Sequence, residues 1–319
     1  MAPGVTRLAP SPTGALHLGN VKTFVVNWLL ARQRGWRVVM RIDDLDGPRV
    51  KPDAADQALE LLGWLGLDWD GPVLHQSHDL SVYRRALDTL ADQGLTYRCP
   101  ATRREIQAAA SAPHEDEHEQ RYPGLYRPRV VDGRRVAPEV ADDAETAVRF
   151  MVPDVEVPYV DQWAGPQRTN VQQHVGDFIV QTKAGLPSYQ LATVVDDARQ
   201  GVTEVVRGED LLRSVPRQRL LYEALKLEPS PRYYHLPLVY GPDGHRLAKR
   251  HGDTRAARYR EAGVSASRLL GLIGHWCGVL PDRREADLAT LLQRLDPDRH
   301  LPGKAVTFTH EDEQWLLSN

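Results

Sequence analysis

The stretch RLAPSPTGALHLGN, residues 7–20, decides the fold. It starts in a short apolar segment, crosses a loop with two prolines and a glycine, and enters the run 18–34, whose apolar residues recur every three or four positions. That spacing predicts a helix, and the apolar run 36–42 after it predicts a buried strand. Strand, loop, helix and strand in this order indicate an α/β fold with a Rossmann-type parallel sheet.

The loop before this helix has the features of an anion site. Backbone N–H groups and the positive dipole end at a helix N-terminus favour an anion such as triphosphate. Gly19 lacks a side chain, so a flat ring such as adenine can lie against the backbone, and His17 and Asn20 can donate hydrogen bonds to phosphate oxygens. The tetrapeptide His-x-Gly-x alone is more typical of an ordinary loop with one exposed histidine, so the interpretation depends on the residues before it.

With those residues included, the stretch resembles the ATP-binding motif of class I aminoacyl-tRNA synthetases. The glutamyl branch has an arginine, Ala-Pro-Ser-Pro-Thr-Gly and a His-x-Gly-x tetrapeptide in this order, and Asn20 replaces the final histidine of the founding motif. The family has a second motif later in the chain, usually Lys-Met-Ser-Lys-Ser, and residues 246–250 (RLAKR) are similar to it. The resemblance implies that Arg246 and Lys249 bind ATP, while Ala248 lacks the hydroxyl group of the family serine.

The resemblance continues through residues 177–208 and implies a glutamate site. Guanidinium groups suit glutamate because each can bind a carboxylate through two hydrogen bonds and stays charged at any working pH. For Arg207, a surface ion pair with Glu209 or Asp210 is the alternative interpretation. The residues carried over to the glutamate site are Arg7, Ala9, Ser11, Asp43, Tyr189 and Arg207.

Asp43 departs from the family pattern. The family usually has Arg-Ile-Glu-Asp here, with the glutamate facing the substrate ammonium, whereas residues 41–44 of this chain read RIDD. Asp43 keeps the charge and is one methylene shorter. A bridging water and an altered pocket are both open explanations.

Many relatives hold a zinc ion in an insertion, with Cys-x-Cys followed by Tyr-x-x-x-Cys. A structural zinc needs four ligands, and two thiolate positions are lost here, so we predict no zinc. His114 and His118 could contribute ligands, but a polar run with histidines is more typical of a solvated loop. The residues at the four family positions are Cys99, Ala101, Tyr122 and Tyr126.

Composition is that of an ordinary globular protein. Apolar residues are 41% and charged residues 26% of 319, which excludes disorder throughout, and the net charge of -3 excludes a uniformly basic nucleic-acid coat. Two cysteines cannot form a disulfide framework, so we expect a reducing compartment, the cytoplasm. The chain has no signal-peptide pattern and no apolar stretch long enough for a bilayer, so we expect no membrane partner.

We divide the chain into four segments. Residues 1–98 are the first half of the catalytic domain with the ATP motif, and 99–146 are an insertion with the degenerate zinc positions. Residues 147–240 are the second half of the catalytic domain, and 241–319 hold the second motif and a small helical subdomain. Further predicted elements are helices at 53–65, 79–93, 211–227 with Asp210 as N-cap, 265–277, 285–295 and 311–317, and β segments at 95–98, 147–160, 177–206 and 234–240.

The short C-terminal part suggests which members of the family are most similar. Longer glutamyl enzymes add large helical anticodon-binding domains, whereas only residues 251–319 follow the second motif here. This plan resembles members that activate glutamate with ATP and Mg²⁺ and transfer it to the queuosine base in the anticodon of tRNA(Asp), and we expect a monomer. Two alternatives are a compact enzyme that charges a tRNA 3′ end and a non-catalytic paralogue that binds tRNA or an amino acid.

Several basic residues could serve a tRNA partner. Phosphate contact and ordinary solvated helix charge are equally compatible with their pattern. These residues are Arg207, Arg213, Arg217, Arg219, Lys226 and Arg232.

We expect Lys249→Ala to lower the rate of adenylate formation far more than it lowers stability, because the lost ammonium would otherwise meet the phosphates. Pyrophosphate–ATP exchange and thermal unfolding of the same preparation measure the two effects. Comparable losses in both would show that Lys249 is structural.

Overall fold

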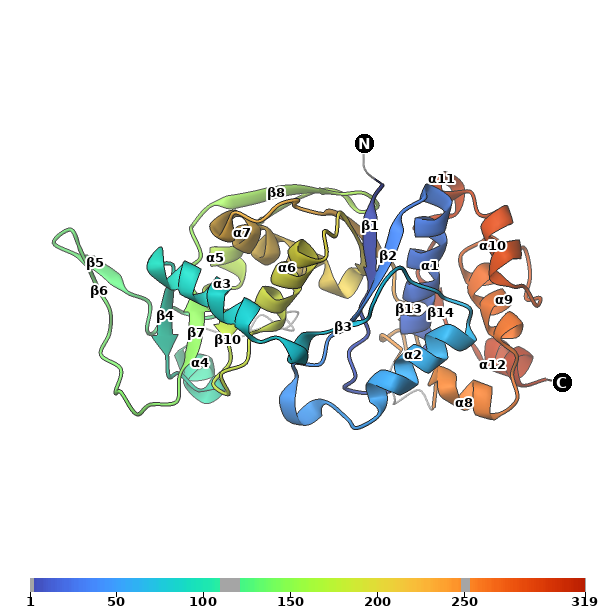
Figure 1. Cartoon of the computed structure of the whole chain (residues 1–319), viewed down its shortest axis with the longest axis horizontal. Helices are drawn as coiled ribbons and strands as arrows, with labels where there is room; N and C mark the ends of the chain where they lie inside the picture. The colour runs from blue at the N-terminus through green and yellow to red at the C-terminus, as the bar shows by residue number, and fades with distance from the viewer. Residues whose placement is uncertain (1–2, 110–120, 248–252, 319) are drawn as a thin grey trace.

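The computed structural model describes residues 3–109, 121–247 and 253–318. Its first sheet is parallel, and Figure 1 shows α1 (Leu18–Arg34) beside it. Gly35 ends α1 in the left-handed conformation that glycine adopts without strain. The predicted first helix and second strand are therefore confirmed. The strands pair in the order β1 (Val5–Leu8), β2 (Arg37–Ile42) and β3 (Leu74–His75), with η1 (Gly47–Arg49), α2 (Ala54–Trp64) and η2 (Gln76–His78) around β3.

A second sheet continues this layer. The N–H group of Thr203 donates to the carbonyl oxygen of Val5 at 2.9 Å, and the Thr203 hydroxyl accepts from the N–H group of Val5 at 2.9 Å, so β11 (Glu204–Gly208) lies beside β1. In the strand order given below, the first three strands of this sheet are parallel to one another, and the fourth is antiparallel to the third. The predicted parallel sheet of Rossmann type is confirmed. The second sheet has the order β11 (Glu204–Gly208), β12 (Arg232–Leu236), β8 (Glu156–Asp161) and β9 (Gly165–Asn170).

Beyond the parallel strands lies an antiparallel sheet, and a hairpin projects from that end of the molecule (Figure 1). The predicted strand near residue 95 is its edge, paired with a strand from the segment after the insertion. The elements of this half are α3 (Ser81–Asp92), β4 (Thr96–Cys99), α4 (Arg103–Ala109), β5 (Arg129–Val131), β6 (Arg134–Val136), β7 (Ala147–Phe150), α5 (Val171–His174), β10 (Phe178–Gln181), α6 (Tyr189–Arg199), η3 (Glu209–Ser214) and α7 (Val215–Leu225).

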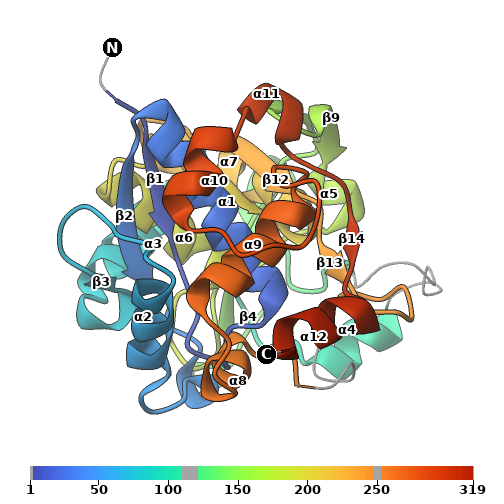
Figure 2. The same cartoon turned by 90° about the vertical axis from the view of Figure 1, so that its right-hand side faces the viewer.

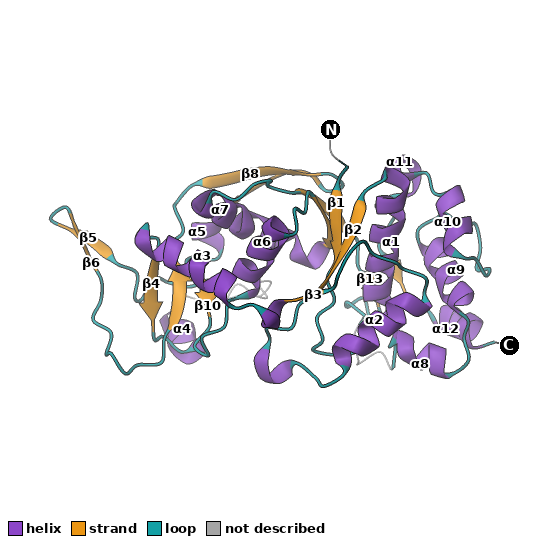
Figure 3. Ribbon diagram, in the orientation of Figure 1, coloured by secondary structure: helices purple, strands orange, loops and turns teal. Residues whose placement is uncertain are grey.

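The C-terminal helices cover the other side of α1, and Figure 2 shows α9 and α10 in front of it. Burial explains the position of α1, because apolar side chains on opposite faces of this helix join one core cluster with the first sheet and the C-terminal helices. Figure 3 shows that this end is almost entirely helical. Its elements are β13 (Val239–Tyr240), α8 (Ala256–Glu261), α9 (Ala266–Trp276), α10 (Leu288–Arg294), α11 (Pro297–His300), β14 (Val306–Thr307) and α12 (His310–Leu317).

Three sequence predictions need correction. The β segment predicted over 177–206 contains helix α6, which buries Leu191 and Val194, so its branched residues line a helix face. The strand predicted over 234–240 is two short strands, because Pro237 between them has no N–H group for a ladder. Asp210 does not cap a helix, because α7 begins only at Val215, after a 3₁₀ segment.

None of the helices in the described part of the chain is long and apolar enough to cross a membrane.

We expect Gly271→Ala to destabilise the protein by about 3 kcal/mol or more. A β-carbon at this position in α9 would lie 1.8 Å from the carbonyl oxygen of Arg284, so the backbone would have to move. Gly63→Ala is the matched control, since a β-carbon on that exposed residue of α2 has no neighbour within 4 Å, and should stabilise by roughly 0.5–1 kcal/mol. Urea unfolding measures both, and equal effects would contradict the packing argument.

Candidate active site

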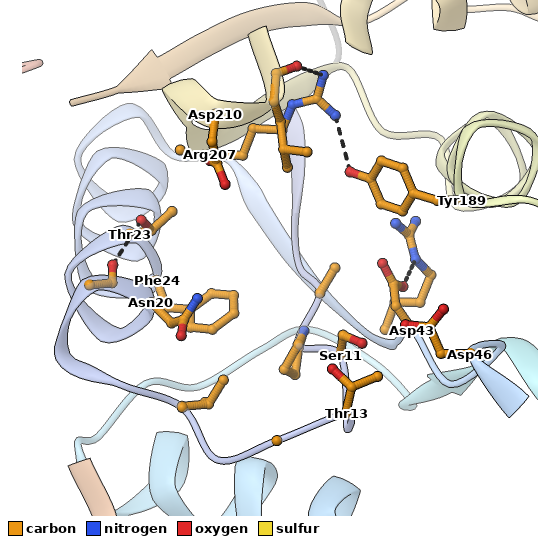
Figure 4. Close-up of a pocket in the computed structure, with 18 of the residues that line it drawn as sticks. Ser11, Thr13, Asn20, Thr23, Phe24, Asp43, Asp46, Tyr189, Arg207 and Asp210 are labelled. Atoms are coloured by element: carbon orange, nitrogen blue, oxygen red, sulfur yellow. Dashed lines mark hydrogen bonds and ion pairs between the residues drawn. The ribbon is translucent and has the colours of Figure 1, made fainter. Parts of the chain in front are cut away.

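A hollow of about 700 Å³ opens where β1, β2 and β11 end. Ligands of open α/β sheets bind at this edge, outside the carboxyl ends of the strands. In Figure 4, Asn20, Thr23 and Phe24 of α1 lie on one side, Asp43 and Tyr189 lie opposite, and Ser11 and Thr13 lie below them. The hollow is therefore bordered by the loop that the sequence singled out and by the start of α6.

The structure brings nearly all of the predicted site residues to this hollow. Lys249, Ala248 and Arg250 of the second motif lie outside the described residues, so their placement stays a prediction. The ligand-binding roles of the others are also still predictions, although their convergence is a property of the fold. The predicted residues that line the hollow are Arg7, Ala9, Ser11, His17, Gly19, Asn20, Asp43, Tyr189, Arg207 and Arg246.

His17 stands at the start of α1 with its ring largely buried. Its backbone N–H group donates to Asn20 Oδ1 at 3.2 Å. Burial, with the charge of Arg246 nearby, lowers the pKa of His17 to about 4, although Asp210 acts in the opposite direction. A β-carbon on Gly19 would lie 3.3 Å from the His17 ring, so the glycine leaves room for it. At neutral pH this helix start therefore presents an uncharged imidazole.

Described residues on both sides of the second motif lie against the first motif and α1. The N–H group of Leu18 donates to the carbonyl oxygen of Thr254 at 3.1 Å, and that of Ala256 donates to Leu16 at 2.9 Å. On the other side, the Lys22 ammonium in α1 donates to the carbonyl oxygen of Pro237 at 2.9 Å. The chain therefore runs along α1 both before and after the undescribed residues 248–252, and Arg246 of the second motif lines the hollow.

Two arginines at the hollow share one carboxylate. Asp197 Oδ1 lies 3.3 Å from Arg7 Nε and 2.6 Å from Arg41 Nη1, and Arg41 Nε also lies 2.7 Å from Asp43 Oδ1. Burial raises the pKa of Asp197, but the positive charges of Arg7 and Arg41 together lower it by more than burial raises it. The pKa of Asp197 is therefore below its usual value. Burial raises the pKa of Asp43, which Arg41 opposes only in part.

Sequence reasoning missed Arg41 and Asp197 as site residues. Both stand in segments that resemble the family, but a buried ion pair between residues far apart in the chain has no local signal. The pair matters for the predicted role of Asp43, because the Asp43 carboxylate that lines the hollow is also the partner of Arg41.

Arg207 is buried, and the surface ion pair considered for it is wrong. Its side chain is 5% exposed and donates to Gln218 Oε1 at 3.0 Å and to the Tyr189 hydroxyl at 3.5 Å. Asp210 instead pairs with Arg246 at 2.6 Å, and Glu209 accepts from the N–H group of Leu238 at 3.1 Å.

The zinc positions hold a packed cluster. The buried Cys99 thiol lies 3.4 Å from the Tyr122 hydroxyl and accepts from Arg149 Nε at 3.4 Å. The Arg149 guanidinium lies 3.7 Å from the centre of the Tyr122 ring, and Tyr126 donates its N–H group to the Tyr122 hydroxyl at 2.9 Å. His114 and His118 lie outside the described residues. Within the described ranges no three His, Cys, Asp or Glu side chains group as metal ligands, and the residues here do not fit a zinc ion.

The six basic residues proposed for tRNA phosphates do not form one surface. Arg207 and Arg217 are buried, and Arg232 donates through Nε to Glu204 at 3.1 Å. Arg213, Lys226 and Arg232 are exposed. Phosphate contact by the whole set is therefore wrong, and it stays open for the exposed members.

Comparisons with known proteins identify the family of the chain. Residues 5–283 match the family model described as tRNA synthetases class I (E and Q), catalytic domain, so the chain belongs to this family of ATP-using ligases. Within the family it belongs with the proteins named Glutamyl-Q tRNA(Asp) synthetase. That of Rhodopirellula baltica is 43% identical, with 88% of this chain and 87% of the relative covered. That of Nocardia farcinica is 45% identical, with 99% and 94% covered.

Longer relatives match over part of their length. A glutamate–tRNA ligase of Synechococcus is 39% identical over 98% of this chain, which spans 65% of that relative. The crystal structure of a glutamate tRNA ligase from Elizabethkingia meningosepticum has a TM-score of 0.79 at 24% identity, covering 99% of this chain and 69% of its own. That likeness supports the fold.

We expect the His17 imidazole to titrate with a pKa of about 4, because its burial disfavours the charged form. A ¹⁵N NMR titration measures this, and His17→Asn assigns the resonance by its loss. A midpoint near the ordinary value of about 6.5 would show that the ring is solvated.

For Asp43→Glu we expect unchanged or tighter glutamate binding, because the longer side chain restores the reach of the family glutamate. Calorimetric titration with glutamate measures the affinity, and Asp43→Asn controls for the charge. A clear loss of affinity in Asp43→Glu would show a pocket rebuilt around the shorter acid and its partner Arg41.

Proposed function

We propose that this protein activates glutamate with ATP as glutamyl-adenylate and transfers the glutamyl group to the queuosine base in the anticodon of tRNA(Asp). One observation carries the proposal: a single hollow combines an uncharged histidine at a helix N-terminus with two buried arginines and a tyrosine hydroxyl. The names of the relatives that match most of their own length supply the acceptor.

In the first step, an oxygen of the glutamate α-carboxylate attacks the α-phosphorus of ATP, and the bond to the bridging oxygen breaks to release pyrophosphate. Arg207 and Tyr189 hold the side-chain carboxylate of glutamate, and Asp43 faces its ammonium. His17 and Asn20 donate hydrogen bonds to phosphate oxygens, where negative charge grows as pyrophosphate leaves. These residues act by positioning and charge neutralisation, so no covalent enzyme intermediate is needed.

The acids at the hollow do not by themselves form a magnesium cage. The described residues include no group of three candidate metal ligands, so Mg²⁺ would be bound mainly by the triphosphate, as is usual for this ion. When bound, it neutralises phosphate charge. The Asp210 carboxylate also lines the hollow, where it forms an ion pair with Arg246.

In the second step, a hydroxyl of the queuosine ring attacks the activated carbonyl, and AMP leaves. The hydroxyl proton passes to solvent water as the ester forms and the bond between the carbonyl carbon and the AMP phosphate oxygen breaks. We propose that the enzyme works as a monomer in the cytoplasm, where its two free thiols, Cys99 and Cys277, stay reduced.

Exchange of labelled pyrophosphate into ATP tests the first step. We expect exchange that depends on glutamate and needs no tRNA. If pure protein shows none at high glutamate while a known synthetase does, the chain is the non-catalytic paralogue considered above.

Transfer of labelled glutamate tests the acceptor. We expect product with tRNA(Asp) that carries queuosine, and none with queuosine-free tRNA(Asp) or with tRNA(Glu). Charging of tRNA(Glu) at its 3′ end would instead support the compact synthetase.

A further inference from the structure

The buried arginines at the hollow differ in how their charge is neutralised. Arg7 and Arg41 share the carboxylate of Asp197, and Arg41 has Asp43 as well. In the part of the chain that the structure describes, Arg207 has no carboxylate within ion-pair distance. A buried charge without a counter-ion is costly unless its hydrogen bonds are satisfied. Arg207 must therefore be held by neutral groups.

Uncharged acceptors bind two of the three nitrogens of this guanidinium. Its Nε donates to His235 Nε2 at 3.0 Å, and its Nη2 donates to Gln218 Oε1 at 3.0 Å and to the carbonyl oxygen of Leu211 at 3.2 Å. Among the described residues, Nη1 has one partner, the Tyr189 hydroxyl, at 3.5 Å on the side of the hollow. Figure 4 shows Arg207 and Tyr189 reaching toward each other across the top of the site. The loosely held Nη1 edge is therefore the one presented to a ligand.

The acceptor at Nε is itself fixed by a buried acid. His235 Nδ1 lies 2.6 Å from Asp161 Oδ2, and both side chains are fully buried. Asp161 Oδ1 in turn accepts from the N–H groups of Trp163 at 3.0 Å and Ala164 at 2.8 Å. A carboxylate at Nδ1 places the ring proton there and leaves Nε2 as an acceptor.

Sheet geometry places these three residues in a row. Asp161 ends β8, His235 lies in β12 and Arg207 lies in β11, which are adjacent parallel strands. Arg207 and His235 are direct partners in the register. The orientation of the guanidinium is therefore set by the layer that forms the floor of the site.

We propose that Asp161 and His235 are positioning residues, which hold Arg207 by its Nε edge so that its Nη1 edge faces a carboxylate of the substrate. The inference rests on the proposed function for the identity of that substrate, glutamate. The arrangement also requires a neutral ring, because an imidazolium would present an N–H group to another N–H group. Burial lowers the pKa of His235, and Arg207 acts in the same direction, although Asp161 opposes them.

The kinetic test compares two substitutions at His235. His235→Phe removes the acceptor but keeps an aromatic ring against Tyr233, whose ring lies stacked at 6.3 Å. We expect the KM for glutamate in pyrophosphate exchange to rise at least about tenfold, with smaller changes in kcat and in the KM for ATP. Preference for glutamate over glutamine should fall as well. His235→Gln carries an amide oxygen that can accept from Arg207, and should recover part of the loss.

His275→Phe in α9 is the matched control, because that histidine contacts Leu280 and does not line the hollow. A folded His235→Phe variant with an unchanged KM for glutamate would overturn the proposal. So would a Gln variant no better than the Phe variant, since a merely structural role would not distinguish them by hydrogen bonding.

A measurement on the wild-type protein does not depend on the variants folding or on activity. In ¹⁵N NMR at neutral pH we expect His235 as the Nδ1–H tautomer with an unprotonated Nε2, with the resonance assigned by its loss in His235→Gln. An Nε2–H tautomer or an imidazolium overturns the proposal. If the expected tautomer is found but the wild type shows no glutamate-dependent exchange, the proposed function is wrong. The inference that His235 and Asp161 position Arg207 is then still supported.

Discussion

One buried carboxylate, that of Asp197, allows two arginines to lie side by side at the ends of adjacent strands. Arg7 belongs to β1, Arg41 to β2 and Asp197 to α6, so the ion pairs join the first part of the chain to a helix that follows the insertion. Without this charge the two guanidinium groups would repel each other in a site with little water. The hollow depends on the contact, because both halves of the catalytic layer border it.

The buried arginines of the site have two different roles. Some form ion pairs within the fold, whereas another is available to bind a ligand. Arg7 and Arg41 are neutralised by acids, whereas neutral groups orient Arg207. His17 contributes no charge at all at neutral pH, since burial keeps its pKa near 4. A ligand with several negative groups therefore meets hydrogen-bond donors at one end of the hollow and, at the other, Arg207, which has no ion-pair partner among the described residues.

The sequence was sufficient to predict much of the first sheet and its helix. Apolar residues that recur every three or four positions before Gly35 indicate a helix without any knowledge of distant contacts. It was insufficient for α6, where Val194 and Val195 favoured a strand until the burial pattern of the tertiary structure was known. Resemblance to the family supplied most of the hollow, including Arg207 and Tyr189. The pairing of His235 with Asp161 could not be predicted, because strand order alone brings those distant residues together.

The bond from Lys22 to Pro237 has a consequence for the thermodynamics of ligand binding. In the free protein, this bond holds the segment before the second motif against α1, the helix that begins in the first motif. Freedom that is already lost in the free protein is not lost again on association. Less of the interaction energy with a nucleotide is therefore consumed in ordering this side of the cleft, and more remains for the affinity itself.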